Sequence, residues 1–152
     1  MAIEIVKFKH NYNPEYQIRS VNVNLGRCFF TFSAVLAEQI GLVGGKYVDI
    51  AQDPETGKWY MSEPFDKQDN ERGSRLYSNT YHGRYGKTFC YRLYNALAAR
   101  KICDEVGATK GCTLMVASRA KVENGRKWYK IFTDKPLKVS NIQFNFNAMP
   151  EA

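Results

Sequence analysis

The sequence is poor in histidine, and its cysteines do not form closely spaced pairs. His10 and His82 are the only histidines, and the four cysteines are Cys28, Cys90, Cys103 and Cys112. Structural zinc sites usually show short, paired ligand spacings, so no metal and no cofactor is expected. Free thiols in a reducing cytoplasm explain the cysteines better than disulfides do.

Long apolar runs are also missing. No stretch approaches the roughly 18–20 residues that a membrane-spanning helix needs. The first nine residues alternate apolar and charged side chains, so we expect no secretory signal. The expected protein is cytoplasmic and has no membrane partner.

The motifs of common enzyme classes are absent as well. The sequence contains no phosphate-binding loop, dinucleotide fingerprint, zinc-protease helix or nucleophile elbow. The glycines of segment 41–45 follow an expected helix, whereas phosphate loops precede one. His82 has neither a nucleophile nor an orienting carboxylate nearby in sequence, and the acidic residues of segment 49–63 fit a solvated hairpin. We therefore expect a protein that is not an enzyme.

Acidic residues are scarce in the second half of the chain. Residues 1–76 hold 9 basic and 10 acidic side chains, a net charge of −1. Residues 77–152 hold 13 basic and 5 acidic side chains, a net charge of +8, and the two sum to the +7 of the whole chain. Such asymmetry favours a polyanionic partner, most often nucleic acid. The alternative is a solvated basic face that only improves solubility.

Aromatic residues make up 14% of the chain and are densest in segment 77–94, where tyrosines alternate with cationic side chains. Aromatic rings beside cations are typical of surfaces that bind single-stranded nucleic acid. A strand whose alternate rings face the core explains the same pattern.

Two segments look like copies of one unit. Each begins with Gly, a basic residue, any residue and Phe, at Gly26 and Gly86, and continues through an Ala-rich helix to a glycine and an apolar run. Each ends in a Trp-Tyr pair after a turn, at Trp59 and Trp128. The repeat predicts an internal duplication in which both tryptophans occupy closing strands and pack on the core.

Local signals place the elements of each unit. Ser33 and Asn95 are expected to cap helices over 34–40 and 96–105, which glycines 41 and 107 then end. Turn residues at 53–57 and 123–125 predict two hairpins, and alternation predicts strands over 3–9, 16–24 and 139–146. The expected fold class is α+β, mostly β, with two short helices and a duplicated strand-helix-hairpin unit that forms a pseudo-two-fold barrel or packed sheets.

The expected domain organisation follows the repeat. Residues 1–62 would form the first unit with two leading strands, and 63–85 a linker or long loop, because that segment begins polar and aperiodic. Residues 86–146 would form the second unit with a C-terminal strand, and 147–152 a frayed tail.

The segment from Phe30 to Ile50 resembles the AbrB/MazE type of swapped-hairpin DNA-binding domain. The similarity consists of an apolar strand (30–33), a helix (34–40) that ends near Gly41-Leu42, and glycines before the strand 46–50. It differs by Ser33 where the family usually has proline and by Lys46 where it usually has an acidic residue. The resemblance implies a pseudo-dimeric barrel that binds DNA.

Charge, aromatic content and resemblance together predict a non-enzymatic nucleic-acid-binding protein involved in transcription regulation, with DNA expected ahead of RNA. Duplex and single strand both remain open, and so does a homo-oligomer. The expected contact residues are Tyr81, Arg84, Tyr85, Lys87, Arg92, Arg126, Lys127 and Lys130. The alternative function is a protein-interaction or assembly module that uses exposed aromatics and sheet edges.

Overall fold

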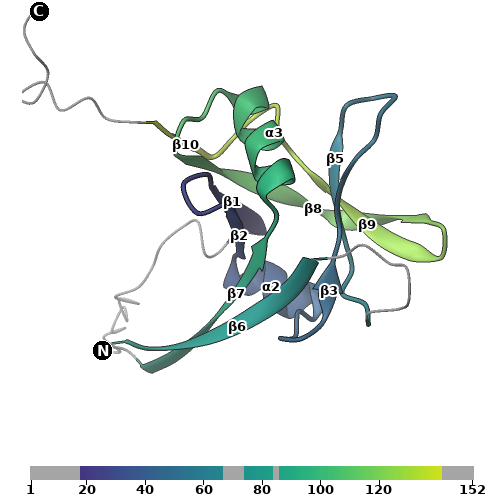
Figure 1. The fold of residues 1–152 in the computed structure, drawn as a ribbon. Helices are drawn as coiled ribbons and strands as arrows, with labels where there is room; N and C mark the ends of the chain where they lie inside the picture. The colour runs from purple at the N-terminus through teal and green to yellow at the C-terminus, as the bar shows by residue number, and fades with distance from the viewer. Residues whose placement is uncertain (1–17, 67–73, 84–85, 142–152) are drawn as a thin grey trace, which may run out of the picture.

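The computed structural model describes residues 18–66, 74–83 and 86–141, and for 79–83 and 86–89 it describes only the backbone (Figure 1). The strands expected at 3–9 and over most of 139–146, and the tail 147–152, lie outside the described residues.

Strands dominate the described part of the chain, as the sequence predicted. Their bounds are β1 Ser20–Asn24, β2 Phe29–Phe32, β3 Tyr47–Val48, β4 Ile50–Gln52, β5 Trp59–Ser62, β6 Ser74–Gly83, β7 Gly86–Tyr94, β8 Gly111–Glu123, β9 Arg126–Ile131 and β10 Lys138–Ser140. Helix α2 spans Ala34–Ile40 and helix α3 spans Ala96–Val106.

The strands form one antiparallel, nearly closed, barrel-like sheet. Its order is β3-β6-β7-β2-β1-β8-β9-β5-β4, with β10 also paired to β8. Strands of the two sequence halves therefore alternate around the barrel, and β1 pairs with both β2 and β8. The basic second half of the sequence consequently does not form a separate cationic lobe.

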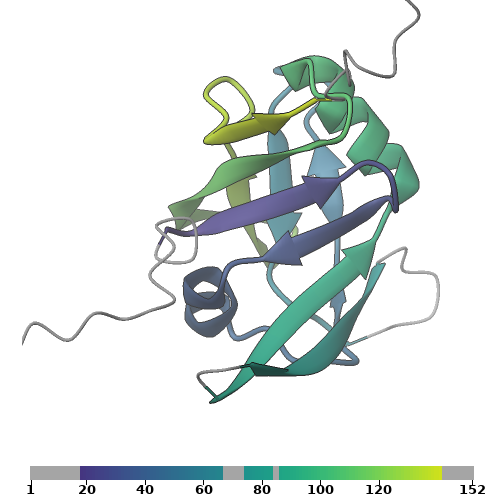
Figure 2. The same ribbon diagram turned by 90° about the vertical axis from the view of Figure 1, so that its left-hand side faces the viewer.

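Both helices begin where the sequence predicted; α2 also ends there, and α3 ends one residue later, at Val106. The side chains of Ser33 and Asn95 accept hydrogen bonds from the backbone N–H groups of Leu36 and Ala98. Gly41 and Gly107 end the helices at φ values of 78° and 74°, a left-handed conformation that suits glycine. Figure 2 shows α2 and α3 at opposite ends of the barrel-like sheet.

The core lies inside the barrel and is built from the inward-facing residues of neighbouring strands. Phe30, Leu76 and Leu93 are fully buried, as is Leu36 of α2 and Ile102 of α3. Strand residues of the core point inward and their neighbours along the strand point to the other face, because successive side chains of a strand point to opposite faces.

The hairpin turns also agree with the sequence. Asn124 and Gly125 join β8 to β9 with positive φ values of 54° and 74°. Glu123 and Arg126 are cross-strand partners, so the loop has two residues. A two-residue turn with both φ values positive matches the right-handed twist of the strands it joins.

Two expectations about the fold are wrong. The segment predicted as a linker or long loop, 63–85, contains β6, which pairs with β7 over eight residue pairs from Leu76↔Leu93 to Gly83↔Gly86. Trp59 is buried in the core, but Trp128 is only half-buried and does not belong to the core.

The two tryptophans differ because they lie on opposite faces of paired strands. Trp59 lies opposite Ile131, whereas Trp128 lies opposite Ser62 and so shares the outward face with Tyr60. The order of elements is the same in each half, namely two strands, a helix and then further strands. The Trp-Tyr pairs themselves do not occupy equivalent places.

Candidate nucleic-acid interface

The outward face of β2, β6 and β7 carries aromatic and arginine side chains at neighbouring positions. Phe29 lies opposite Tyr94, and Tyr77 lies opposite Arg92. The residues between them, Phe30, Leu76 and Leu93, point into the core. In Figure 2 the purple β1, the dark-blue β2 and the green β7 lie side by side across the front, with the teal β6 next to β7.

The rings on this face contact one another edge to face. The Tyr77 and Tyr94 ring centroids are 6.0 Å apart at an interplanar angle of 75°, and those of Phe29 and Tyr94 are 5.9 Å apart at 66°. Tyr77 is 47% exposed and Tyr94 50% exposed, so both keep ring surface open to a ligand. Phe29 is buried beneath its neighbours.

Two guanidinium groups border these rings. The Arg92 Cζ atom lies 4.3 Å from the Phe29 ring centroid, and the Arg75 Cζ atom lies 5.6 Å from that of Tyr77. Arginine stacks on aromatic faces and still directs N–H donors toward phosphate oxygens. We call Phe29, Arg75, Tyr77, Arg92 and Tyr94 the aromatic–arginine cluster.

The strands that carry and flank this cluster contain no acidic residue. Strands β1, β2, β6 and β7 together hold Arg75, Lys87 and Arg92 and neither Asp nor Glu. The described cationic side chains of this face are Arg75 and Arg92, and cations without carboxylates on the same strands attract polyanions. This arrangement depends on the sheet order, which brings β2 beside β7.

Only some of the contact residues expected from sequence can be placed on this face. Arg92 belongs to the cluster, and Tyr81 and Lys87 lie in the backbone of the β6–β7 hairpin, opposite Thr88 and His82. The side chains of Tyr81 and Lys87, and the whole of Arg84 and Tyr85, lie outside the described residues.

Arg126 occupies a different part of the molecule and has a structural role there. Its Nη1 atom donates to Asp49 Oδ2 at 2.9 Å, and its Cζ atom lies 3.9 Å from the Phe65 ring centroid. The Arg126 and Asp49 side chains are each 21% exposed. Asp49 therefore balances most of the charge that Arg126 would offer to a phosphate.

The other two predicted basic residues also lie on β9. Lys127 is exposed, and its carbonyl accepts a hydrogen bond from the Glu63 N–H. Lys130 is half-buried, and its Nζ atom lies 4.8 Å from the Phe132 ring centroid. The structure thus places these residues on a different strand from Arg92, which is the cross-strand partner of Tyr77.

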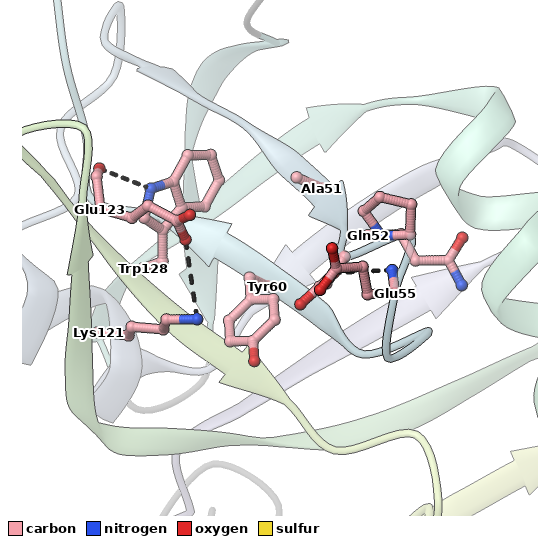
Figure 3. Close-up of a pocket in the computed structure, with 9 residues that line it drawn as sticks. Ala51, Gln52, Glu55, Tyr60, Lys121, Glu123 and Trp128 are labelled. Carbon is pink, nitrogen blue, oxygen red and sulfur yellow. Dashed lines mark hydrogen bonds and ion pairs between the residues drawn. The ribbon is translucent and has the colours of Figure 1, made fainter.

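A shallow cleft of about 450 Å³ lies on the outward face of β4, β5, β8 and β9 (Figure 3). Tyr60 and Trp128 form its aromatic part, and its charged residues are Asp53, Glu55, Lys121 and Glu123. Lys121 Nζ lies 3.8 Å from the Glu123 carboxylate and 5.9 Å from the Tyr60 ring centroid. Three carboxylates against one ammonium give the cleft a net negative charge, which disfavours a phosphate backbone.

Sequence reasoning missed Arg75 and Tyr94 as site residues. The sequence pattern places Tyr94 only in the dense aromatic stretch and Arg75 inside the expected linker. The local signal is weak: Arg75 and Tyr77 flank the apolar Leu76 at a spacing of two, but Arg-Leu-Tyr-Ser over 75–78 does not alternate regularly.

All four cysteines are free thiols, two of them buried and two partly exposed. Cys103 and Cys112 are buried, and the side-chain hydrogen bond between them, together with burial, raises the pKa of the Cys112 thiol. Burial likewise raises the pKa of the Cys90 thiol. A raised pKa keeps the Cys90 and Cys112 thiols protonated at neutral pH, and a protonated thiol is a poor nucleophile and metal ligand. The hydrogen bond with Cys112 has the opposite effect on its partner and lowers the pKa of the Cys103 thiol.

Two features are absent from the described residues. No three His, Cys, Asp or Glu side chains of those ranges gather in a way that would hold a metal ion. Neither of the two described helices has the length and apolar character to cross a membrane.

Comparison with known proteins does not assign the chain to a family. No protein-family model, no curated protein and no solved structure matches the chain.

Proposed function

We propose that this protein is a non-enzymatic nucleic-acid-binding protein that contacts its ligand through the aromatic–arginine cluster. The observation that carries the proposal is the set of strands β1, β2, β6 and β7, whose residues include Arg75, Arg92 and the exposed Tyr77 and Tyr94 and no Asp or Glu. Phosphate contacts supply most of the affinity of such proteins, and ring stacking on bases adds to it. DNA is the expected nucleic acid.

The family resemblance and the internal duplication belong to this proposal. Each half of the chain runs through two strands, a helix and further strands, and the halves interleave within one barrel-like sheet. That order supports a pseudo-two-fold barrel related to the AbrB/MazE type, with transcription regulation as the role the resemblance implies. Superposing an experimental structure of residues 18–66 on residues 74–141 tests the duplication, and helices at non-equivalent positions would exclude it.

The binding proposal is tested by a titration of labelled oligonucleotides at several salt concentrations. We expect the logarithm of affinity to fall with the logarithm of salt concentration, by about 0.7–0.9 for each phosphate contact. Replacing Arg75 and Arg92 with glutamine should lower that slope, whereas replacing Lys127 and Lys130 should change it less. Equal losses from both pairs would indicate non-specific attraction.

The cleft of Figure 3 favours a second candidate function, an assembly module. A negatively charged cleft lined by Tyr60 and Trp128 is complementary to the cationic cluster face of another copy. A contact between two different surfaces is head-to-tail, and it builds rings or filaments. Light scattering at low and high salt tests this candidate. Monomers at low salt would exclude it, and salt-sensitive oligomers that Glu123→Lys abolishes would support it.

A further inference from the structure

We infer that the ligand of the aromatic–arginine cluster is a single-stranded nucleic acid whose bases are unstacked from one another. The inference rests on the proposed nucleic-acid function and specifies the substrate class of the same surface. It is carried by the relative orientation of the two exposed rings.

Tyr77 and Tyr94 present ring faces that are far from parallel. Their interplanar angle is 75° and their centroids are 6.0 Å apart. Successive bases of a duplex are parallel and separated by about 3.4 Å, and their faces are covered by neighbouring base pairs. Two bases that each stack on one of these tyrosines must therefore be splayed apart, which a single strand allows and a duplex does not.

The cationic groups lie where the backbone of such a strand would pass. Arg75 borders the Tyr77 ring at 5.6 Å, and Arg92 lies opposite Tyr77 across the β6–β7 pair. Tyr77 thus has one guanidinium at its border and another on its cross-strand partner, while Tyr94 contacts Phe29, the ring that Arg92 covers. Alternation of stacking rings with cations is the arrangement that binds single strands without reading their sequence.

The cluster is also fixed in place before any ligand arrives. Phe29 is 8% exposed and supports the Tyr94 ring from below, and Arg92 covers Phe29 at 4.3 Å. The backbone partners Phe29↔Tyr94 and Thr31↔Arg92 hold these side chains on one face. A pre-organised surface loses little side-chain freedom on binding.

A duplex has a different route to this protein. Strands β6 and β7 form a long two-stranded ribbon, and the major groove of DNA admits such a ribbon. Binding in that mode would use groove edges and phosphates and would leave the faces of Tyr77 and Tyr94 unstacked. The two ligand classes therefore predict different effects of removing the rings.

The experiment measures fluorescence anisotropy of labelled dT20, U20 and a 20-base-pair hairpin duplex with the full chain. The test variant is Tyr77→Leu with Tyr94→Leu, and the matched control is Tyr77→Phe with Tyr94→Phe, which keeps both rings. Tyr60→Leu on the opposite cleft controls for position. Circular dichroism checks that every variant is folded.

We expect dT20 or U20 to bind more tightly than the duplex. The leucine variant should weaken single-strand binding by roughly 5- to 150-fold for each ring that stacks. The phenylalanine variant should lose far less than the leucine variant, and Tyr60→Leu should stay near wild type. Preference for dT20 over U20, or the reverse, identifies which strand the surface favours.

Two results would overturn the inference and leave the proposed function standing. One is tighter binding of the duplex that the leucine variant does not weaken, which points to the β6–β7 ribbon. The other is single-strand binding that survives loss of both rings, which places the site elsewhere. No binding to any of the three oligonucleotides at 50 mM salt would overturn the proposed function itself.

Discussion

Trp59 and Trp128 stand in nearly identical sequence contexts and have different roles in the folded protein. Trp59 is 3% exposed inside the barrel, and its indole N–H has no hydrogen-bond partner among the described residues. Trp128 is half-buried at the cleft, where its Nε1 atom donates to the Glu123 carbonyl at 3.4 Å. The side of the strand that a residue occupies decides between these roles.

We predict that Trp59→Ala lowers the free energy of unfolding by about 3–5 kcal/mol, because it leaves a large cavity in the core. Trp128→Ala should cost about 1 kcal/mol or less. Trp59→Phe should cost clearly less than Trp59→Ala, since it refills much of the volume and removes a buried donor without a partner, a defect worth about 1–3 kcal/mol. Urea denaturation measures all three, and equal losses from both alanine variants would contradict this assignment.

The Arg126–Asp49 pair should stabilise the fold more than an exposed ion pair does. Both side chains are 21% exposed, and Phe65 covers the guanidinium. We expect a double-mutant cycle with Arg126→Gln and Asp49→Asn to give a coupling energy above the ~0.2–1 kcal/mol of exposed pairs. The Lys121–Glu123 pair is the control, because its side chains are 59% and 62% exposed. Equal coupling energies for the two pairs would count against a structural role of Arg126.

At the scale of elements, the helices and turns follow from local interactions and the strand pairs do not. Ser33 and Asn95 cap helices whose ends were readable from sequence, because each cap bonds to a backbone N–H three residues away. The pairing of β1 with β8 joins residues about 90 positions apart. Strand β1 therefore finds β8 only when the whole barrel has formed.

Close approach of β1 and β8 leads to a prediction at Gly111. A Cβ atom added there would lie 2.1 Å from the carbonyl oxygen of Val23, a backbone atom that cannot turn away. Gly111→Ala should therefore disrupt the end of the β1–β8 pair and lower the free energy of unfolding by about 1–3 kcal/mol or more.

Gly26→Ala is the matched control for this substitution. The nearest atom to its added Cβ is a side-chain oxygen of Asn24 at 3.5 Å, an ordinary contact. Thermal denaturation should show a large loss for Gly111→Ala and little change for Gly26→Ala. A Gly111→Ala protein as stable as wild type would mean that β1 and β8 are not so close.

At the scale of the whole molecule, interleaving makes the two sequence halves depend on each other. Strand β1 pairs with β8, β2 with β7, and β5 with β9, so each of these pairs crosses between the halves. Neither half can satisfy its strands alone, and an unpaired strand edge is costly to expose. The described part of the chain should unfold as one cooperative unit.

This prediction is measured with single-tryptophan variants. Trp128→Phe leaves Trp59 as the probe of β5, and Trp59→Phe leaves Trp128 as the probe of β9. In each variant we expect the fluorescence transition in urea to coincide with the loss of far-UV circular dichroism, as two-state behaviour requires. Two separated transitions in one variant would show that the halves are independent domains.

The sequence by itself determined the features that rest on contacts a few residues apart. These are the mostly β content, the two helices with their caps and glycine ends, and the presence of a hairpin turn at 123–125. Each depends on a hydrogen bond or a backbone angle that the local residues supply, so the tertiary structure keeps these local conformations.

Only the tertiary structure decided which residues share a surface. Side chains along a strand alternate between its two faces. Trp59 lies opposite Ile131 and points inward, whereas Trp128 lies opposite Ser62 and points outward. The sheet order placed Phe29 beside Tyr94 and Tyr77 beside Arg92, and it paired Arg126 with Asp49, 77 residues away. These neighbours are set by pairing and core packing across the whole barrel, and no local pattern encodes them.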